Sequence, residues 1–426
     1  MPSTDTSTAA PPPSSYKAAL AVMTTLFFMW GFLTELNDVL VPHLKSIFDL
    51  NYFQAMLIQF AFFSAYLLFS VPWARVIDWI GYKRTMVAGL FTMALGACLF
   101  IPAASAASYP LFLAALTVLA AGITALQVAA NPYVAVLGPE KTASSRLNLA
   151  QAVNSLGHTT APWIGGLLIL SAAPLGVEAL RRMSAEAQLA YRIHEASSVK
   201  LPYLVIGLAL LALGIAIARF KLPPMPTAER HGAAGATRSL RKHPHLVLGV
   251  IAIFLYVGAE VAIGSLLINY LIQPEIGNIS RTLAATLVGF CYWGGAMVGR
   301  FIGSAILQKA PTRTVLAIAA VMACVLVCTS MLTLGHVAMW SLILVGFFNS
   351  VMFPSIFTLG IAELGPLTGD ASGLLVMAIV GGAVIPPATG WLADHIGIHH
   401  SFILPAACYL YVCYYALKGS QTASTA

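Results

Sequence analysis

Long apolar runs alternate with short polar connections over almost the whole chain. Each run is close to the roughly 20 apolar residues that a helix needs to cross the hydrocarbon core of a bilayer. The runs lack the residue-by-residue alternation of a half-buried strand, so we interpret them as helices. The pattern predicts twelve membrane-spanning helices, at about residues 18–42, 54–77, 84–104, 109–136, 147–171, 201–220, 245–273, 284–306, 313–333, 337–361, 371–396 and 401–418.

A polar connection near the middle of the chain divides these spans six to six. It covers residues 221–244 and carries several Pro, Gly and basic residues. The first residues are rich in Pro, Ser and Thr, a composition typical of a disordered segment. We therefore expect a disordered cytoplasmic tail, an N-terminal six-helix bundle, a cytoplasmic linker and a C-terminal six-helix bundle, at residues 1–17, 18–222, 223–244 and 245–426.

An internal repeat supports this division. Four residues around span four recur around span ten at a constant offset of 222 residues: Gln127, Pro132, Leu137 and Gly138 correspond to Asn349, Pro354, Leu359 and Gly360. The repeated spans run in the same order and orientation. Parallel repeats of this kind are typical of transporter halves that are related by an axis along the membrane normal.

The composition excludes an ordinary soluble domain. The chain is 59% hydrophobic and 9% charged, whereas soluble domains carry about 25% charged residues. The net charge of +7 would suit nucleic-acid binding, but almost all of the basic residues lie in the connections between apolar runs. Most of them fall on the side that holds both termini, which the positive-inside rule assigns to the cytoplasm. We expect a multi-pass protein of the inner cell membrane that contacts lipid and no nucleic acid.

Span one contains polar residues at membrane depth, which is costly. A charge there costs at least ~2.5–3.5 kcal/mol, and such residues usually mark a substrate or ion path. Asn37 and Asp38 form a polar cluster, and Glu35 lies one turn before Asp38 on roughly the same face. We predict that Asp38 binds a coupling ion. The alternative is that Asp38 only caps or pairs inside the bundle.

Spans four and five carry amide side chains at helical spacing. Gln127 and Asn131 lie one turn apart, and Pro132 can kink the helix behind them. In span five a polar stripe contains Asn148, Gln151, Ser155 and His158, with Asn154 beside it. A span with so many amides must face a wet cavity rather than lipid. Helix-to-helix bonding is the alternative for the amides, and a hydrogen-bonded core histidine is the preferred interpretation of His158 over a proton shuttle.

The second half offers fewer charges. Glu260 lies inside span seven, and Asn269 follows on a similar face about two and a half turns later. Tyr292 and Trp293 in span eight would suit a sugar ring as an aromatic platform, although packing is the commoner use of such residues. Asn349 in span ten is the repeat partner of Gln127.

The connection between spans two and three has the composition of a conformational gate. Gly81 permits a tight turn, and the charges Asp78, Lys83 and Arg84 lie on either side of it. Such charges can pair and lock one conformation of a moving interface. An ordinary positively charged loop is the alternative. The stretch resembles the signature loop of the major facilitator superfamily, except that Ala74 stands where that family usually has Gly.

More of the chain resembles the fucose permease branch of the same superfamily, which contains fucose, glucose/galactose and related sugar symporters. The motifs that carry the resemblance lie in both halves: Leu36-Asn37-Asp38 with Pro42, Ala129-Ala130-Asn131-Pro132, Val136-Leu137-Gly138-Pro139-Glu140, Arg146-Leu147-Asn148-Leu149-Ala150-Gln151, Asn154-Ser155, Tyr256-Val257-Gly258-Ala259, Gly299-Arg300, Phe353-Pro354-Ser355-Ile356-Phe357 and Gly381-Gly382.

The resemblance implies an all-α membrane fold of two six-helix bundles with alternating access to a central sugar site. It also implies a proton-binding carboxylate in span one, here Asp38. In the fucose permease a second carboxylate occupies the position of Gln127 and an amide occupies that of Glu260. Because this chain has the opposite arrangement, glucose- and galactose-type members are the better guide to its substrate.

We therefore predict a hexose importer coupled to a proton or sodium ion and acting as a monomer, with no other cofactor. A sugar uniporter, or a symporter for fucose or an amino sugar, is the alternative. An intramembrane enzyme is disfavoured because the chain lacks the common catalytic motifs and any metal-ligand spacing. The expected substrate-binding residues are Asn37, Gln127, Asn131, Gln151, Asn154, Glu260, Asn269, Trp293 and Asn349. The expected gating residues are Asp78, Lys83, Arg84, Glu140, Arg146 and Arg300.

The predicted orientation can be checked by labelling single cysteines in intact cells. A cysteine placed near residue 230 should react only after the cells are permeabilised, and one near residue 190 should react from outside. This expectation rests on the distribution of basic residues. Labelling near residue 230 in intact cells would show the opposite topology.

Overall fold

A computed structural model describes residues 13–48, 52–169, 199–223 and 242–422, together with residue 240 and a few single residues between 183 and 197. Within these ranges the side chains of residues 13–15, 37–48, 52–56, 162, 163 and 165–169 are outside the description. The regular structure of the described residues is entirely helical. Residues 1–12 of the expected tail, most of the 223–244 linker and the side chains of Asn37 and Asp38 therefore lie outside the described residues. Residues 13–17, which were assigned to the tail, are helical.

The described residues of the first half contain five long helices: α1 (Pro13–Phe48), α2 (Tyr52–Ser105), α3 (Tyr109–Val136), α4 (Ala143–Ile169) and α7 (Lys200–Arg219). α2 is twice the length of a span, and it breaks at Gly81, where φ is 80° and ψ is 165°. This positive φ is cheap only for glycine. α2 therefore carries predicted spans two and three, joined by the tight turn expected at Gly81.

The second half is built from shorter segments joined end to end. These are α9 (Pro244–Leu271), α10 (Arg281–Leu287), α11 (Gly294–Ile306), α12 (Thr312–Leu332), α13 (Gly335–Asn349), α14 (Met352–Gly360), α15 (Thr368–Met377), α16 (Gly381–Ile396), α17 (Ile398–Ser401) and α18 (Ile403–Tyr414). A π-helical stretch, Val288–Trp293, joins α10 to α11. Such irregular turns are frequent at functional sites, and this one lies beside the residues described below.

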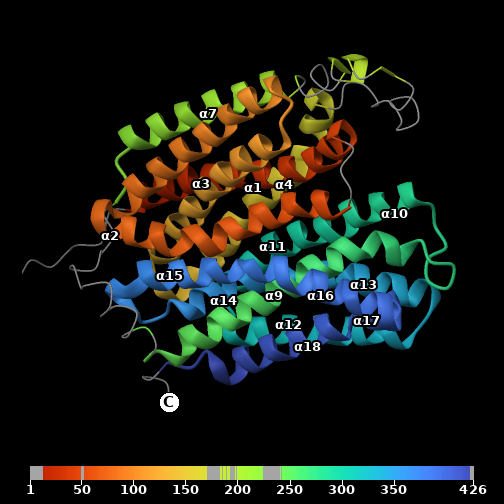
Figure 1. Ribbon diagram of the computed structural model, residues 1–426. Coiled ribbons are helices and arrows are strands. Elements are labelled where there is room, and N and C mark those ends of the chain that lie inside the picture. The colour runs from red at the N-terminus through yellow and green to blue at the C-terminus, as the bar shows by residue number, and fades with distance from the viewer. Residues whose placement is uncertain are drawn as a thin grey trace, which may run out of the picture.

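Ten stretches of the described helices are long and apolar enough to cross a membrane. One of them covers both halves of α2, and α4 supplies the remaining predicted span. The helical membrane fold predicted from the sequence is therefore confirmed. In Figure 1 the helices of the first half, coloured red to yellow-green, lie above those of the second half, coloured green to blue. The residue boundaries assigned to the two bundles stay a prediction.

The two halves touch through hydroxyl groups at one end of the molecule. Ser144 Oγ lies 2.5 Å from Thr358 Oγ1, and Thr312 Oγ1 donates to Ser144 Oγ at 3.0 Å. Beside them Ser145 Oγ donates to the carbonyl of Ser304 at 2.7 Å. We call this the inner end, because the basic residues predict that it faces the cytoplasm.

Close packing extends the contact from the inner end towards the middle of the membrane. A Cβ placed on Gly303 of α11 would lie 2.3 Å from Val351 Cγ1 and 2.8 Å from Asn148 Nδ2 of α4. Ser372 of α15 donates to the carbonyl of Val128 in α3 at 2.8 Å. The two halves are therefore held together from the inner end inwards, which closes that end.

This closed inner end can be tested by a disulfide across it. Ser145 Oγ and Ser304 Oγ are 3.4 Å apart, and a disulfide needs Cβ atoms about 3.5–4.5 Å apart. The double variant Ser145→Cys/Ser304→Cys, with a protease site inserted in the 223–244 linker, should run at full size on a non-reducing gel after cleavage. Each single variant is the control and should fall into two fragments. Fragmentation of the oxidised double variant would contradict the closed interface.

Candidate functional site

Three of the predicted amides come together in the first half. Gln127 and Asn131 lie one turn apart on α3, and Gln151 on α4 donates from Nε2 to Asn131 Oδ1 at 3.4 Å. Gln127 Nε2 donates to the hydroxyl of Tyr66 on α2 at 2.9 Å. Asn131 Nδ2 is buried and has no hydrogen-bond partner among the described residues. This donor is available to a polar ligand.

Asn154 has a different environment. Its Nδ2 donates to the backbone carbonyl of Phe27 on α1 at 2.7 Å, and its side chain packs where a Cβ on Gly31 would be. This geometry makes Asn154 a link between α4 and α1, one of the two interpretations open for a membrane amide. Its predicted role in ligand binding gains no support from this position.

A second polar cluster lies in the other half, where Glu260 and Asn349 are joined through tyrosines. Tyr292 donates to the carbonyl of Glu260 at 3.2 Å and accepts from Asn349 Nδ2, also at 3.2 Å. Tyr256 donates to the carbonyl of Asn349 at 3.0 Å. Glu260 Oε1 and Asn349 Oδ1 are buried without hydrogen-bond partners among the described residues. Both oxygens are acceptors that a ligand hydroxyl would satisfy.

Arg300 connects the two clusters. Its guanidinium, carried by α11, donates to the hydroxyl of Ser155 on α4, and its backbone carbonyl accepts from Asn148 Nδ2 at 2.6 Å. Ser155 itself donates to the carbonyl of Gln151 at 3.1 Å, which places it one turn from the first cluster. Arg300 also acts electrostatically on Glu260. The residue predicted only as a gating charge therefore lies between the two polar clusters.

The predicted aromatic and outer positions lie towards the edge of this arrangement. Trp293 is 42% exposed, and its ring lies at right angles to that of Tyr292. Asn269 is exposed and lies nine residues after Glu260, about 13.5 Å further along α9 at 1.5 Å per residue. The structure therefore brings Trp293 next to the second cluster and leaves Asn269 outside it.

The sequence did not indicate a pair that now joins α1 to α4. His158 Nδ1 lies 3.2 Å from Glu35 Oε2, and each side chain is about one-third exposed, at 34% and 33%. His158 makes the hydrogen bond expected of it, but its partner is a carboxylate and the residue is not buried. Of the three tyrosines that position Gln127, Glu260 and Asn349, Tyr66 was missed and Tyr292 was expected only as an aromatic platform. Tyr256 was named only within a motif of the resemblance, although it precedes Glu260 by one turn.

At the inner end, Asp78 does not make the predicted pair with Lys83 or Arg84. Lys83 Nζ donates instead to the carbonyl of Ala218 on α7 at 2.8 Å. The half-buried Asp78 lies close enough to Asp370 of α15 for mutual repulsion. Lys83 is held away because α7 offers it unpaired carbonyls at its last turn.

Arg146 binds backbone rather than a partner charge. Its guanidinium donates to the carbonyls of Val134 at 3.2 Å, Pro139 at 2.8 Å, and Ala135. These are carbonyls around the C-terminus of α3, which have no partners within the helix itself. Glu140 is exposed on the surface. Arg146 therefore fixes the turn between α3 and α4.

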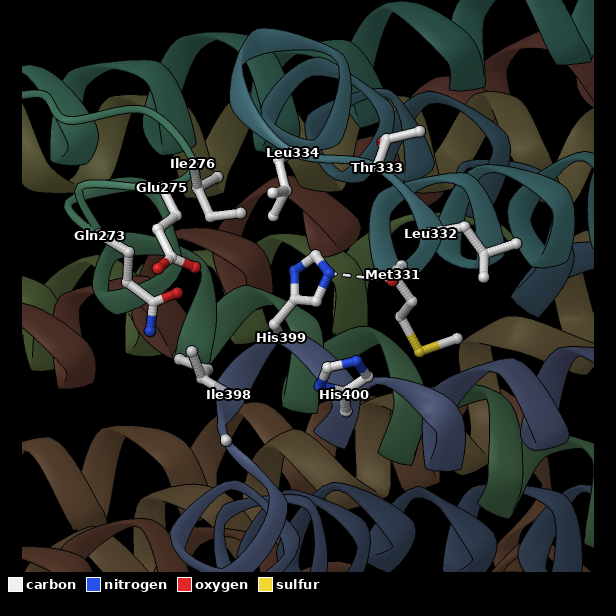
Figure 2. A pocket seen from close by; sticks show the side chains of 11 residues that line it. Gln273, Glu275, Ile276, Met331, Leu332, Thr333, Leu334, Ile398, His399 and His400 are labelled. Carbon is white, nitrogen blue, oxygen red and sulfur yellow. Dashed lines mark hydrogen bonds between the residues drawn. The ribbon is translucent and has the colours of Figure 1, made fainter.

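A cavity of about 430 Å³ lies apart from these clusters, at the end opposite the inner end. Figure 2 shows its lining, with Glu275 facing the ring of His399 and His400 beside it. His399 Nε2 donates to the carbonyl of Met331 at 2.9 Å. None of the residues predicted for the functional site lines this cavity.

Helices of membrane-spanning length in two stacked sets, with buried polar groups between them, define a multi-pass membrane transporter. The chain belongs to the Major Facilitator Superfamily, whose family model matches residues 20–379. It is 50% identical over 409 residues to the glucose/galactose transporter of Brucella abortus biovar 1 (strain 9-941), covering 96% of this chain and 95% of that one. The family predicted from the sequence is thereby confirmed.

Two further relatives extend the comparison. The L-fucose-proton symporter of Escherichia coli (strain K12) is 38% identical over 419 residues, covering 96% of this chain and 95% of that protein. The crystal structure of the superfamily transporter FucP in the outward conformation matches with a TM-score of 0.88 and 36% identity, over 96% of this chain and 100% of that one. These relatives are transporters, which indicates that this chain is not an enzyme.

The role of Arg146 can be measured by thermal unfolding. Arg146→Ala should lower the unfolding temperature, because each buried carbonyl left without a donor costs about 1–3 kcal/mol. Lysine cannot reproduce the guanidinium fork, so Arg146→Lys should rescue little. The neighbouring exposed acid supplies the control, and Glu140→Gln should melt at the wild-type temperature. If Arg146→Ala unfolds at the wild-type temperature, Arg146 does not stabilise this turn, and the predicted gating role is the interpretation that remains.

Proposed function

We propose that this chain imports a hexose of the glucose or galactose type together with a coupling proton or sodium ion, by alternating access. The observation that carries the proposal is a group of buried, unsatisfied polar atoms in the two polar clusters and on Arg300 between them, a region that we call the seam. Asn131 Nδ2 belongs to the first half, and Arg300 Nε, Glu260 Oε1 and Asn349 Oδ1 belong to the second. Buried polar atoms are nearly always paired, so a polar ligand is the natural partner of this set.

The chemistry of the set suits a sugar. It contains donors and acceptors, and neighbouring hydroxyls of a hexose can donate to a carboxylate while accepting from an amide or guanidinium. Because the donors and acceptors come from both halves, a bound sugar would draw the halves together. That is what an alternating-access site requires. The predicted contacts with Gln127 and Gln151 fit the same site, since both line the first-half cluster.

The names of the relatives favour glucose or galactose over fucose. The relatives at 50% and 44% identity are called glucose/galactose transporters, the second one putatively, and the fucose symporter is more distant at 38%. Glu260 also supports this choice, since the resemblance places an amide there in the fucose permease. This function needs no cofactor other than the coupling ion.

The setting follows from the same features. We place the protein in the inner cell membrane with both termini in the cytoplasm, on the basic residues of the connections. We propose a monomer, because one chain supplies both sides of the seam. Asp38 stays the proposed coupling residue by its position in span one. The closed inner end agrees with an outward-facing state.

Uptake into proteoliposomes tests the function, with the pH and sodium gradients imposed separately. The wild type should exchange labelled glucose or galactose by counterflow and accumulate it with one of the two gradients. Asp38→Asn imitates a protonated acid, so it should keep counterflow and lose accumulation. Asp394→Asn, which changes an exposed acid on α16, should behave as the wild type.

The outcomes separate the parts of the proposal. Absence of counterflow with both sugars would refute the hexose function. Counterflow without accumulation in either gradient would identify a uniporter. Accumulation by Asp38→Asn at the wild-type level would remove Asp38 as the coupling residue and leave the sugar assignment intact.

A further inference from the structure

We propose that the Glu35–His158 pair is a proton-binding site that couples the pH gradient to sugar transport. The inference rests on the proposed function and assigns it a second ion site, distinct from Asp38. It starts from the contact of 3.2 Å between His158 Nδ1 and Glu35 Oε2. Imidazole is the side chain whose ordinary charge change falls between pH 5 and 8. A carboxylate oxygen at this distance accepts a hydrogen bond from a protonated ring nitrogen.

The pair is reachable from the side that is not closed. His158 lies one turn beyond Ser155 on α4, away from the hydroxyl contacts of Ser144 and Ser145 at the inner end. Both side chains are about one-third exposed, whereas Ser155 is buried. On this proposal a proton reaches the pair from the open side, without crossing the contact between Arg300 and Ser155.

The pair is also close enough to the sugar seam to influence it. Thr159, next to His158, contacts the sulfur of Met297 on α11 at 3.7 Å. Ser155, one turn before His158, accepts from Arg300. The carboxylate of Glu260 lies within electrostatic range of Arg300 and of the His158 ring. His158 thus contacts Glu35 directly, and Ser155, one turn before His158, links α4 to Arg300.

The four groups Glu35, His158, Arg300 and Glu260 come from four helices, α1, α4, α11 and α9, and they are His158 and the charged groups that the contacts above connect to it. Asp38 follows Glu35 on α1 by one turn, but its side chain lies outside the described residues. With a neutral imidazole and both carboxylates ionised, the four groups carry a net charge of −1. One proton on His158 brings the total to zero.

This change of charge supplies a physical basis for coupling. Closing the outer side takes the groups out of water, and an uncompensated charge in that environment is costly. The proton removes the excess charge and the sugar satisfies the polar atoms of the seam, so the closed state becomes accessible when both are bound. Proton and sugar then favour each other's binding, as linkage requires of a symporter. When the inner end opens, the proton leaves to the cytoplasm.

The test uses His158→Asn, which can still donate to Glu35 but cannot be protonated, and Glu35→Gln. Reconstituted with labelled glucose or galactose in sodium-free buffer, both variants should keep counterflow and lose accumulation driven by an inward proton gradient. Sugar-dependent proton uptake, followed with an internal pH dye, should be lost with it. The control His400→Asn changes an exposed histidine of the outer cavity (Figure 2) and should keep all three.

Accumulation by both variants at the wild-type level would overturn the inference, and so would a wild type that accumulates sugar only with a sodium gradient. Neither result would contradict the proposed hexose transport, which is refuted only if the wild type shows no counterflow. If a variant loses counterflow as well, sugar binding to the purified protein is measured between pH 5 and 9. A flattened pH dependence supports the proton site, and a wild-type pH dependence refutes it.

Discussion

The structure depends on one constraint, that polar groups inside a membrane protein must find partners because water is excluded from the bilayer core. Arg300 meets this constraint across the interface, since its guanidinium on α11 binds the hydroxyl of Ser155 on α4. Its Nε remains unsatisfied, as do single atoms of Asn131, Glu260 and Asn349. The residues that carry these unsatisfied atoms also form hydrogen bonds to the protein or pack beside residues that do. Each side chain is therefore held in place while part of its bonding capacity stays free for a ligand.

The supporting tyrosines show how this precision is obtained. Tyr66 holds Gln127 in the first half, and Tyr292 holds Asn349 in the second. Gln127 and Asn349 are repeat partners in the sequence, so each half uses the same device, an amide on its repeated helix that is bonded to a tyrosine of a neighbouring helix. The repeat thus extends from sequence spacing to side-chain chemistry.

The fold could be predicted from the sequence because the bilayer imposes one length and one kind of pattern on every span. The turn at Gly81 followed in the same way, from a residue whose backbone freedom is required there. The clusters on α3 and α4 were also accessible, since Gln127, Asn131 and Gln151 follow helical spacing. Contacts between distant helices were not accessible. Helical spacing gives the face on which His158 or Arg300 lies, but not which of several neighbouring helices that face meets.

Two contacts that the sequence did not predict have the same origin. Arg146 and Lys83 looked like gating charges because their natural partners in a sequence are acids. In the fold both bind the unpaired carbonyls of helix ends, which are invisible in a list of side chains. Membrane helices end close to the short connections that carry the basic residues, so backbone carbonyls compete with acids for every such cation.

The hydroxyl contacts at the inner end have a consequence for the rate and direction of the conformational cycle. A hydrogen bond between neutral groups contributes only about 0.5–1.5 kcal/mol, because water replaces it at nearly equal free energy. The hydrogen bonds at the inner end can therefore be replaced by hydrogen bonds to water, and salt does not screen them. They involve Ser144, Ser145, Thr312 and Thr358. These hydroxyl contacts therefore add little to the free energy that opening the inner end requires. Small free energies of ion and sugar binding then suffice to decide which side is open.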